Sequence, residues 1–175
     1  PSHQFPLGVS MPISRRVQLL NWAKSAPDRY IIEDDYDSEF RYDAKPLPSL
    51  QSIDDHGRVI YLGTFSKAIA PSLRIGYMVL PESLLPLYQA QYAQFSCAVS
   101  RFDQQVLDAF LHQGAFETHL NRMRKLYKEK RKILISALET AFSHSLQYQG
   151  EQAGHHLLVH LPGLPDGGVL CRTAA

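Results

Sequence analysis

The stretch that decides the fold runs from Val59 to Tyr77 and reads VIYLGTFSKAIAPSLRIGY. It opens with an apolar run that is typical of a buried strand, and it then breaks at Gly63 into hydroxyl residues and a lone lysine, Lys67. A second apolar run follows at residues 75–80. We therefore expect Lys67 to be held between two buried strands and to be partly desolvated. Desolvation favours the neutral amine, which is the form that attacks a carbonyl group to make a Schiff base.

The side chains around this lysine are suited to a phosphate group. Thr64 and Ser66 carry hydroxyl donors, and Arg74 carries a planar guanidinium that can bind two phosphate oxygens at once. A Schiff-base lysine beside such a pocket indicates pyridoxal phosphate as the cofactor. The alternative is that Lys67 is a solvated surface lysine, because lysines in loops are usually exposed.

A second stretch, RYIIEDDYD at residues 29–37, supports the cofactor interpretation. It is an apolar strand that ends in carboxylates, and pyridoxal phosphate needs a carboxylate on its pyridinium nitrogen so that the ring can act as an electron sink. The hydroxyl of Tyr36 suits the phenolic oxygen of the ring. In open α/β sheets ligands lie beyond the carboxyl ends of the strands, and both stretches become polar at such an end.

The acidic cluster leaves two alternatives open. Asp34 and Asp35 are both candidates for the partner of the pyridinium nitrogen. In addition, Asp35, Asp37 and Glu39 could together hold a divalent metal ion, because such ions prefer oxygen ligands. A metal site would leave the lysine and the arginine of the other stretch without a role, so we favour the cofactor.

Three motifs together resemble a known family: EDDYDSEFRY at residues 33–42, YLGTFSK at 61–67 and PSLRIGY at 71–77. They are similar to the fold-type I aminotransferases, and within these to the aminotransferase-like domain of MocR-type transcriptional regulators of the GntR family. The resemblance implies an α/β large domain, with helices on both faces of a mainly parallel sheet, and then the start of a small C-terminal α+β domain. We expect these parts at residues 1–115 and 144–175, with a long linking helix at 116–143.

The resemblance also implies a role for each candidate residue. It implies that Lys67 carries the cofactor as an internal aldimine, and that Asp34 meets the pyridine nitrogen. Tyr36 would meet the phenolic oxygen. Thr64, Ser66 and Arg74 would hold the phosphate. Family members usually have an asparagine beside the phenolic oxygen, whereas this chain has Phe5, a departure that MocR-type proteins share.

Two functions are compatible with all of these residues. The first is a regulator whose aminotransferase-like domain senses the cofactor and an amino acid or amine ligand. The second is a class I/II aminotransferase that transfers amino groups between amino acids and 2-oxo acids, with Lys67 as the general base. We favour the regulator, because Phe5 and the spacing of Asp34 and Tyr36 are typical of MocR-type proteins. We expect the chain to be a fragment of a homodimer that binds DNA only through a missing N-terminal winged-helix domain.

Composition bounds these hypotheses. The chain has 175 residues, of which 45% are hydrophobic, and a formal net charge of +1, so it is one domain or part of one without a global basic excess for nucleic acid. Its two cysteines form no disulfide framework and no metal-binding spacing. The sequence shows no signal peptide and no apolar run long enough to cross a membrane, so we expect a cytoplasmic protein without a membrane partner.

Hydrophobic periodicity predicts the remaining elements. Helices are expected at 14–26, 82–95, 100–112 and 117–142, and strands at 30–33, 59–62, 75–80, 146–148 and 155–161. The last helix carries seven basic residues, which fits either contact with nucleic acid or, more simply, a solvated helix face. His156 and His160 share a strand face and could bind zinc, but with no third ligand nearby in the sequence we predict no zinc site.

Overall fold

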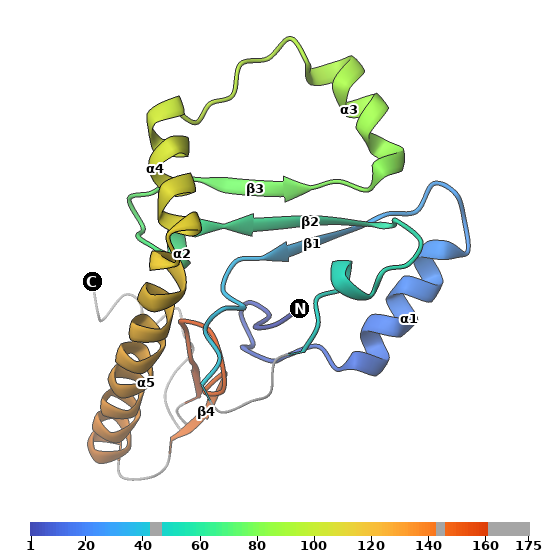
Figure 1. The fold of residues 1–175 in the computed structure, drawn as a ribbon. Helices are drawn as coiled ribbons and strands as arrows, with labels where there is room; N and C mark the ends of the chain where they lie inside the picture. The colour runs from blue at the N-terminus through green and yellow to red at the C-terminus, as the bar shows by residue number, and fades with distance from the viewer. Residues whose placement is uncertain (43–46, 143–145, 161–175) are drawn as a thin grey trace, which may run out of the picture.

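A computed structural model describes residues 1–42, 47–142 and 146–160 of the chain (Figure 1). The elements, with η marking short 3-10 helices, are α1 (Ile13–Lys24), β1 (Ile31–Asp35), η1 (Gln51–Ile53), β2 (Val59–Thr64), α2 (Phe65–Ala68), β3 (Gly76–Val79), η2 (Glu82–Leu84), α3 (Leu85–Tyr92), α4 (Arg101–His112), α5 (Ala115–Ala141), β4 (Gln147–Gln149) and β5 (Leu158–His160).

The larger sheet has three strands in the order β1-β2-β3. β1 and β2 are parallel, with Asp34 opposite Leu62, whereas β2 and β3 are antiparallel, with Thr64 opposite Gly76. The antiparallel step has a simple cause: the connection through residues 65–75 is shorter than the dozen or so residues that a parallel crossover needs. The predicted α/β class is confirmed, and the described part of the sheet contains one parallel and one antiparallel pairing.

The burial of two strands differs from the sequence-based expectation. In β1 the acidic side chains Glu33 and Asp35 are buried, whereas Ile32 is 66% exposed. Glu33 can be buried because its carboxylate accepts hydrogen bonds from the backbone N–H groups of Leu50 (2.8 Å) and Gln51 (2.9 Å), which replace its water shell. β3 was expected to be buried, but all four of its residues are exposed, since it lies at the edge of the described sheet.

Helix α1 is held by a buried arginine. Arg16 is 0% exposed, and its guanidinium donates hydrogen bonds to the backbone carbonyls of Pro1, Met11 and Pro48. A guanidinium has five donors and no acceptor, so a ring of carbonyl oxygens satisfies it without a carboxylate partner. These contacts tie α1 to the N-terminal segment and to the chain that precedes η1.

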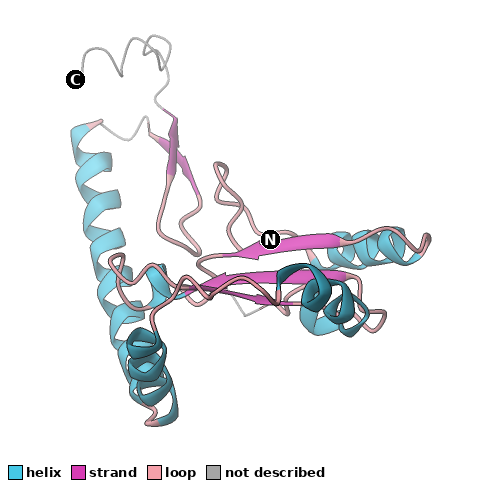
Figure 2. Ribbon diagram, turned by 90° about the horizontal axis from the view of Figure 1, so that it is seen from above, coloured by secondary structure: helices cyan, strands magenta, loops and turns pink. Residues whose placement is uncertain are grey.

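The two helices α4 and α5 follow the sequence-based expectation closely. The hydroxyl of Ser100 accepts a hydrogen bond from the backbone N–H of Asp103 at 3.1 Å and caps α4. Gly114, with φ of +70°, makes the turn into α5. The predicted helix over 82–95 is instead divided into η2 and α3. Figures 1 and 2 show α5 running past the end of the sheet at which β2 finishes.

The C-terminal strands β4 and β5 form a separate antiparallel pair that lies beside α5 (Figure 2). Residues 161–175, which make up much of the predicted small domain, are outside the described part of the chain, so the domain boundaries remain a prediction. Within the described residues, none of the helices combines the length and the apolar character that crossing a membrane requires.

Candidate functional site

All six candidate residues lie at one edge of the larger sheet. Because β1 and β2 are parallel, their carboxyl ends meet at the same edge, where Asp35 is opposite Gly63. Because β3 runs the other way, its first residue, Gly76, lies opposite Thr64 at that same edge. The topology therefore brings together the carboxylates after β1, the hydroxyl residues and lysine after β2, and Arg74 just before β3.

The structure separates the two neighbouring aspartates. Asp34 is exposed, and its side chain is on the face of β1 that also carries Ile32. Asp35 is 7% exposed and accepts a hydrogen bond from the hydroxyl of Tyr61 at 2.9 Å. Burial raises the pKa of Tyr61, and the charge of Asp35 raises it further. Asp35 is therefore committed to an internal contact, whereas Asp34 is accessible to a ligand.

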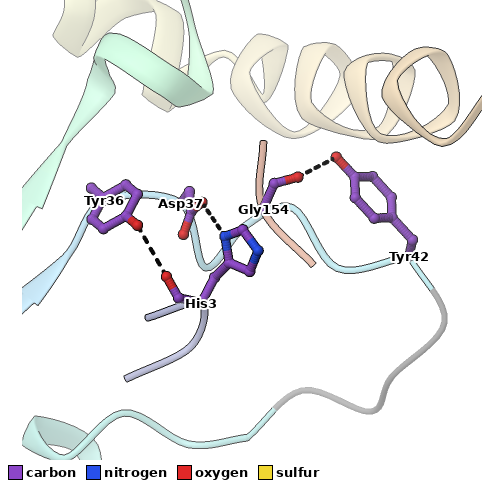
Figure 3. A network of polar contacts seen from close by, with 5 residues as sticks. All are labelled: His3, Tyr36, Asp37, Tyr42 and Gly154. Carbon is purple, nitrogen blue, oxygen red and sulfur yellow. Dashed lines mark hydrogen bonds and ion pairs between the residues drawn. The ribbon is translucent and has the colours of Figure 1, made fainter. Parts of the chain in front are cut away.

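Tyr36 links the end of β1 to the N-terminal segment. Its hydroxyl donates a hydrogen bond to the backbone carbonyl of His3 at 3.0 Å (Figure 3). Burial raises the pKa of Tyr36, and the charges of Asp37 and Asp34 raise it further. The hydroxyl therefore keeps its proton at neutral pH and donates it to His3.

The short helix α2 sets the directions of the residues after β2. The side chain of Thr64 caps α2, accepting from the N–H of Ser66 at 3.1 Å and donating to the carbonyl of Ile75 at 3.2 Å. The buried hydroxyl of Ser66 donates to the carbonyl of Leu73 at 2.7 Å. These contacts fold the loop of residues 64–75 back onto the end of β2.

The expectation that Lys67 is desolvated between two strands is wrong. Ser66 and Ala68 on either side of it are buried, but Lys67 itself is exposed, because α2 turns those two neighbours inward and Lys67 outward. Arg74 is exposed as well. Both cationic groups are thus accessible at the sheet edge.

Two cavities open at this edge. The first, of about 350 Å³, is lined by Lys67 and Ser66 from α2, by residues of α5 such as Tyr127 and Lys130, and by the segment before β5. The second, of about 270 Å³, is lined by Asp34 to Asp37 and by the first five residues of the chain. Candidate residues of the cofactor site therefore line both cavities.

The cavities meet at a cluster that the sequence did not reveal. His3 lines the smaller cavity and His156 the larger one, and their ring centroids are 4.0 Å apart. The Nδ1 of His3 donates to the carboxylate of Asp37 at 3.1 Å, and both side chains are buried (Figure 3). The aromatic residues Phe40 and Tyr127 enclose the neighbouring ring of His155. The histidines in the turn at residue 3 and at 155–156 were the only sequence signal for this cluster.

The structure bears on both metal sites considered from the sequence, the carboxylate site after β1 and the pair His156 and His160. Among the described residues, the carboxylates of Asp35, Asp37 and Glu39 do not converge on a common point that would hold an ion. His156 lies outside β5, so it does not share a strand face with His160, contrary to the prediction. Its neighbours are His3 and Asp37 instead.

The basic residues of α5 contribute to packing. Nε of Arg124 donates to the carbonyl of Glu39 at 2.6 Å, and Nζ of Lys128 donates to the carbonyl of Tyr42 at 3.2 Å. The guanidinium of Arg131 lies over the ring of Tyr42, 4.5 Å from its centroid. These contacts favour a structural role for this part of the helix over contact with nucleic acid.

Comparison with known proteins places the chain in a family. The profile of the aminotransferase class I and II family matches residues 3–170, so the chain belongs to that family. Its fold matches the crystal structure of Pyrococcus horikoshii kynurenine aminotransferase in complex with PMP, with a TM-score of 0.86 and 33% identity, over 99% of this chain and 43% of that one. The predicted fold-type I resemblance is confirmed.

Transcriptional regulators are among the relatives. The chain is 48% identical over 164 residues to the uncharacterized HTH-type transcriptional regulator YdeL of Bacillus subtilis (strain 168), covering 93% of this chain and 35% of the relative. It is 38% identical over 174 residues to the probable rhizopine catabolism regulatory protein MocR of Rhizobium meliloti, covering 99% and 35%. The predicted similarity to MocR-type proteins is confirmed, and the chain spans about a third of the length of these relatives.

Proposed function

We propose that the edge of the larger sheet binds pyridoxal phosphate and that Lys67 is the residue to which the cofactor is attached. The observation that carries this proposal is topological. The parallel pairing of β1 with β2 and the antiparallel pairing of β2 with β3 bring an amine, a carboxylate, three hydroxyls and a guanidinium to one edge. When bound, pyridoxal phosphate supplies two groups: an aldehyde, which reacts with a lysine amine, and a ring, which takes up electrons.

The residues present fit this cofactor in chemistry and accessibility. Lys67, Asp34 and Arg74 are exposed at the edge, so each can reach a ligand without displacing packed side chains. Asp34 would accept a hydrogen bond from the pyridinium nitrogen and favour its protonated form, whereas Asp35 is buried and less accessible to a ligand. Arg74 offers two parallel N–H donors to the phosphate.

The hydroxyl residues must exchange partners to serve the cofactor. A hydroxyl has one proton to donate, and those of Tyr36 and Ser66 are donated to backbone carbonyls at 3.0 and 2.7 Å. On cofactor binding Tyr36 would turn its proton from His3 to the phenolic oxygen, and Ser66 would turn its proton from Leu73 to the phosphate. The exchange leaves each hydroxyl satisfied, and the carbonyls of His3 and Leu73 lose these hydrogen bonds in return.

We infer that the whole protein is a MocR-type transcriptional regulator. Identities of 48% and 38% to regulators, over nearly the whole chain, support this inference. In this proposal the domain senses pyridoxal phosphate together with an amino acid or amine, acts as a homodimer in the cytoplasm, and controls a separate N-terminal domain that binds DNA. Phe5 is 78% exposed and gives the site an apolar group where aminotransferases usually have an asparagine.

An active aminotransferase is the second candidate, because the chain is also 33% identical to the Pyrococcus enzyme. In that case Lys67 would take up the α proton of the bound amino acid as a general base and then release it as a general acid. Incubation of the intact protein with an amino acid and a 2-oxo acid distinguishes the two: steady turnover favours the enzyme, and binding without turnover favours the regulator.

The cofactor proposal is tested by titrating the intact protein with pyridoxal phosphate and recording its visible absorbance. Wild-type protein is expected to develop the absorbance of lysine-bound cofactor, and Lys67→Ala is expected to lose it. Lys130→Ala is the matched control, because Lys130 lines the same cavity as Lys67 but stands on α5. An unchanged spectrum in Lys67→Ala, or its loss in Lys130→Ala, would contradict the proposal.

A further inference from the structure

We propose that His3, Asp37 and His156 form a binding site for a divalent transition-metal ion, with Zn²⁺ as the best match. One potential ligand atom of each residue lies within 4.8 Å of those of the other two. The three residues come from the N-terminal turn, the loop after β1 and the segment before β5. This site is distinct from the cofactor residues and does not depend on the proposed function.

Two ring nitrogens in the cluster need an explanation. The Nε2 atoms of His3 and His156 are buried, and neither has a hydrogen-bond partner among the described residues. The side chain of His3 is 0% exposed, so bulk water does not satisfy it. Buried polar atoms without a partner are uncommon in folded proteins. An ion bound at Nδ1 of His3 and Oδ2 of Asp37 can take Nε2 of His156 as its second nitrogen ligand, whereas Nε2 of His3 would carry the ring proton.

The donor set matches the chemistry of zinc. Two imidazole nitrogens and a carboxylate oxygen are ligands that Zn²⁺ binds in proteins, with water in the fourth position. Bonds of about 2.1 Å in a tetrahedral site place ligand atoms roughly 3.4 Å apart. Nδ1 of His3 and Oδ2 of Asp37 are already 3.1 Å apart. The ligand atom of half-buried His156 lies within 4.8 Å of both, so this side chain is the one that would adjust to close the site.

The charges around the cluster favour a cation. The carboxylates of Asp35 and Asp37 both act on Glu39, so three acidic groups share this region of the interior. Two positive charges act against the binding of a cation. The charge of Lys67 acts on His156, and the charge of Arg124 acts on Glu39. An ion bound by His3 and Asp37 would replace their hydrogen bond by two metal bonds and offset the repulsion among the carboxylates.

Binding of an ion would join three segments that are far apart in the sequence. Tyr36 is bonded to the backbone of His3, so the ion would also fix the end of β1 next to the smaller cavity. His156 lines the larger cavity on the other side. Binding of the ion is expected to raise the free energy of unfolding, because the ion binds the folded chain and not the separated segments.

The test is calorimetric titration of ZnCl₂ into the intact, metal-free protein with no pyridoxal phosphate added. Wild-type protein is expected to bind one ion. Asp37→Asn and His156→Ala are each expected to raise the dissociation constant for Zn²⁺ by roughly tenfold or more. His160→Ala is the matched control, an exposed histidine in the adjacent strand, and is expected to bind as the wild type does. Asparagine at position 37 still accepts the His3 hydrogen bond, so this variant is expected to fold.

Cobalt provides a second measurement that needs no variant. Co²⁺ added to the wild-type protein is expected to give the visible absorption of a four-coordinate site with nitrogen and oxygen ligands. Absence of that absorption contradicts the proposal. Equal Zn²⁺ affinity of the wild type, Asp37→Asn and His156→Ala also contradicts it, because the ion would then be bound elsewhere.

Discussion

Asp34 and Asp35 are adjacent carboxylates, and replacing each by alanine in turn distinguishes their roles. The two properties to compare are the affinity for pyridoxal phosphate and the stability of the fold. The structure gives them opposite environments: Asp34 is exposed, whereas Asp35 is 7% exposed and accepts the hydroxyl proton of Tyr61 at 2.9 Å. If Asp34 is the partner of the pyridinium nitrogen, its loss affects cofactor binding. Loss of Asp35 affects the stability of the fold.

The expected magnitudes follow from these contacts. Asp35→Ala leaves the half-buried hydroxyl of Tyr61 without its acceptor, which costs about 1–3 kcal/mol of unfolding free energy. Asp34→Ala removes an exposed side chain and changes that free energy by at most about 0.5 kcal/mol. A hydrogen bond to a charged group contributes about 1.5–3 kcal/mol. Asp34→Ala is therefore expected to weaken pyridoxal phosphate binding roughly 10- to 100-fold.

Urea unfolding measures the stability of each variant, and titration followed by visible absorbance measures its affinity for the cofactor. Both measurements are made on the intact protein at a temperature where both variants are folded. The reasoning is refuted if Asp35→Ala weakens cofactor binding more than Asp34→Ala does, because the accessible carboxylate would then not be the ring partner.

Two further predictions concern Glu33, which is buried, and Glu39, which is half-buried. Glu33→Gln places an amide donor against one of the N–H groups of Leu50 and Gln51, and we expect it to lower the unfolding free energy by about 1–3 kcal/mol in urea; an unchanged value would mean that the loop does not need this anchor. Burial is the main cause that raises the pKa of Glu39, so the fold favours the neutral acid, and the stability present at low pH is lost as the pH rises through that raised pKa. Glu39→Gln is therefore expected to raise the melting temperature at pH 8 and not at pH 4, and an equal effect at both pH values would contradict this explanation.

The sequence was sufficient to predict how the candidate residues come together. Apolar runs that end in polar residues predict strands with functional groups at their carboxyl ends, and the parallel pairing of β1 with β2 places those ends at one edge. The cap at Ser100 and the long helix α5 were also predictable, because both depend on residues close together in the chain.

Burial of individual side chains was less predictable, because it depends on partners that are distant in the sequence. Glu33 is buried only because two N–H groups of the chain before β2 meet it. Lys67 is exposed because the turn of α2 directs it outward, which an apolar run on either side does not reveal. His3 and Asp37 are 34 residues apart, and no local pattern links them to each other or to His156.

The attachment point of the cofactor tests the central claim most directly. The intact protein is loaded with pyridoxal phosphate and treated with borohydride, which fixes the pyridoxyl group to the amine that holds it, and the labelled peptide is identified by mass spectrometry. We predict that the label is on Lys67. A label on Lys130 or on any other amine, or no label at all, would contradict the account.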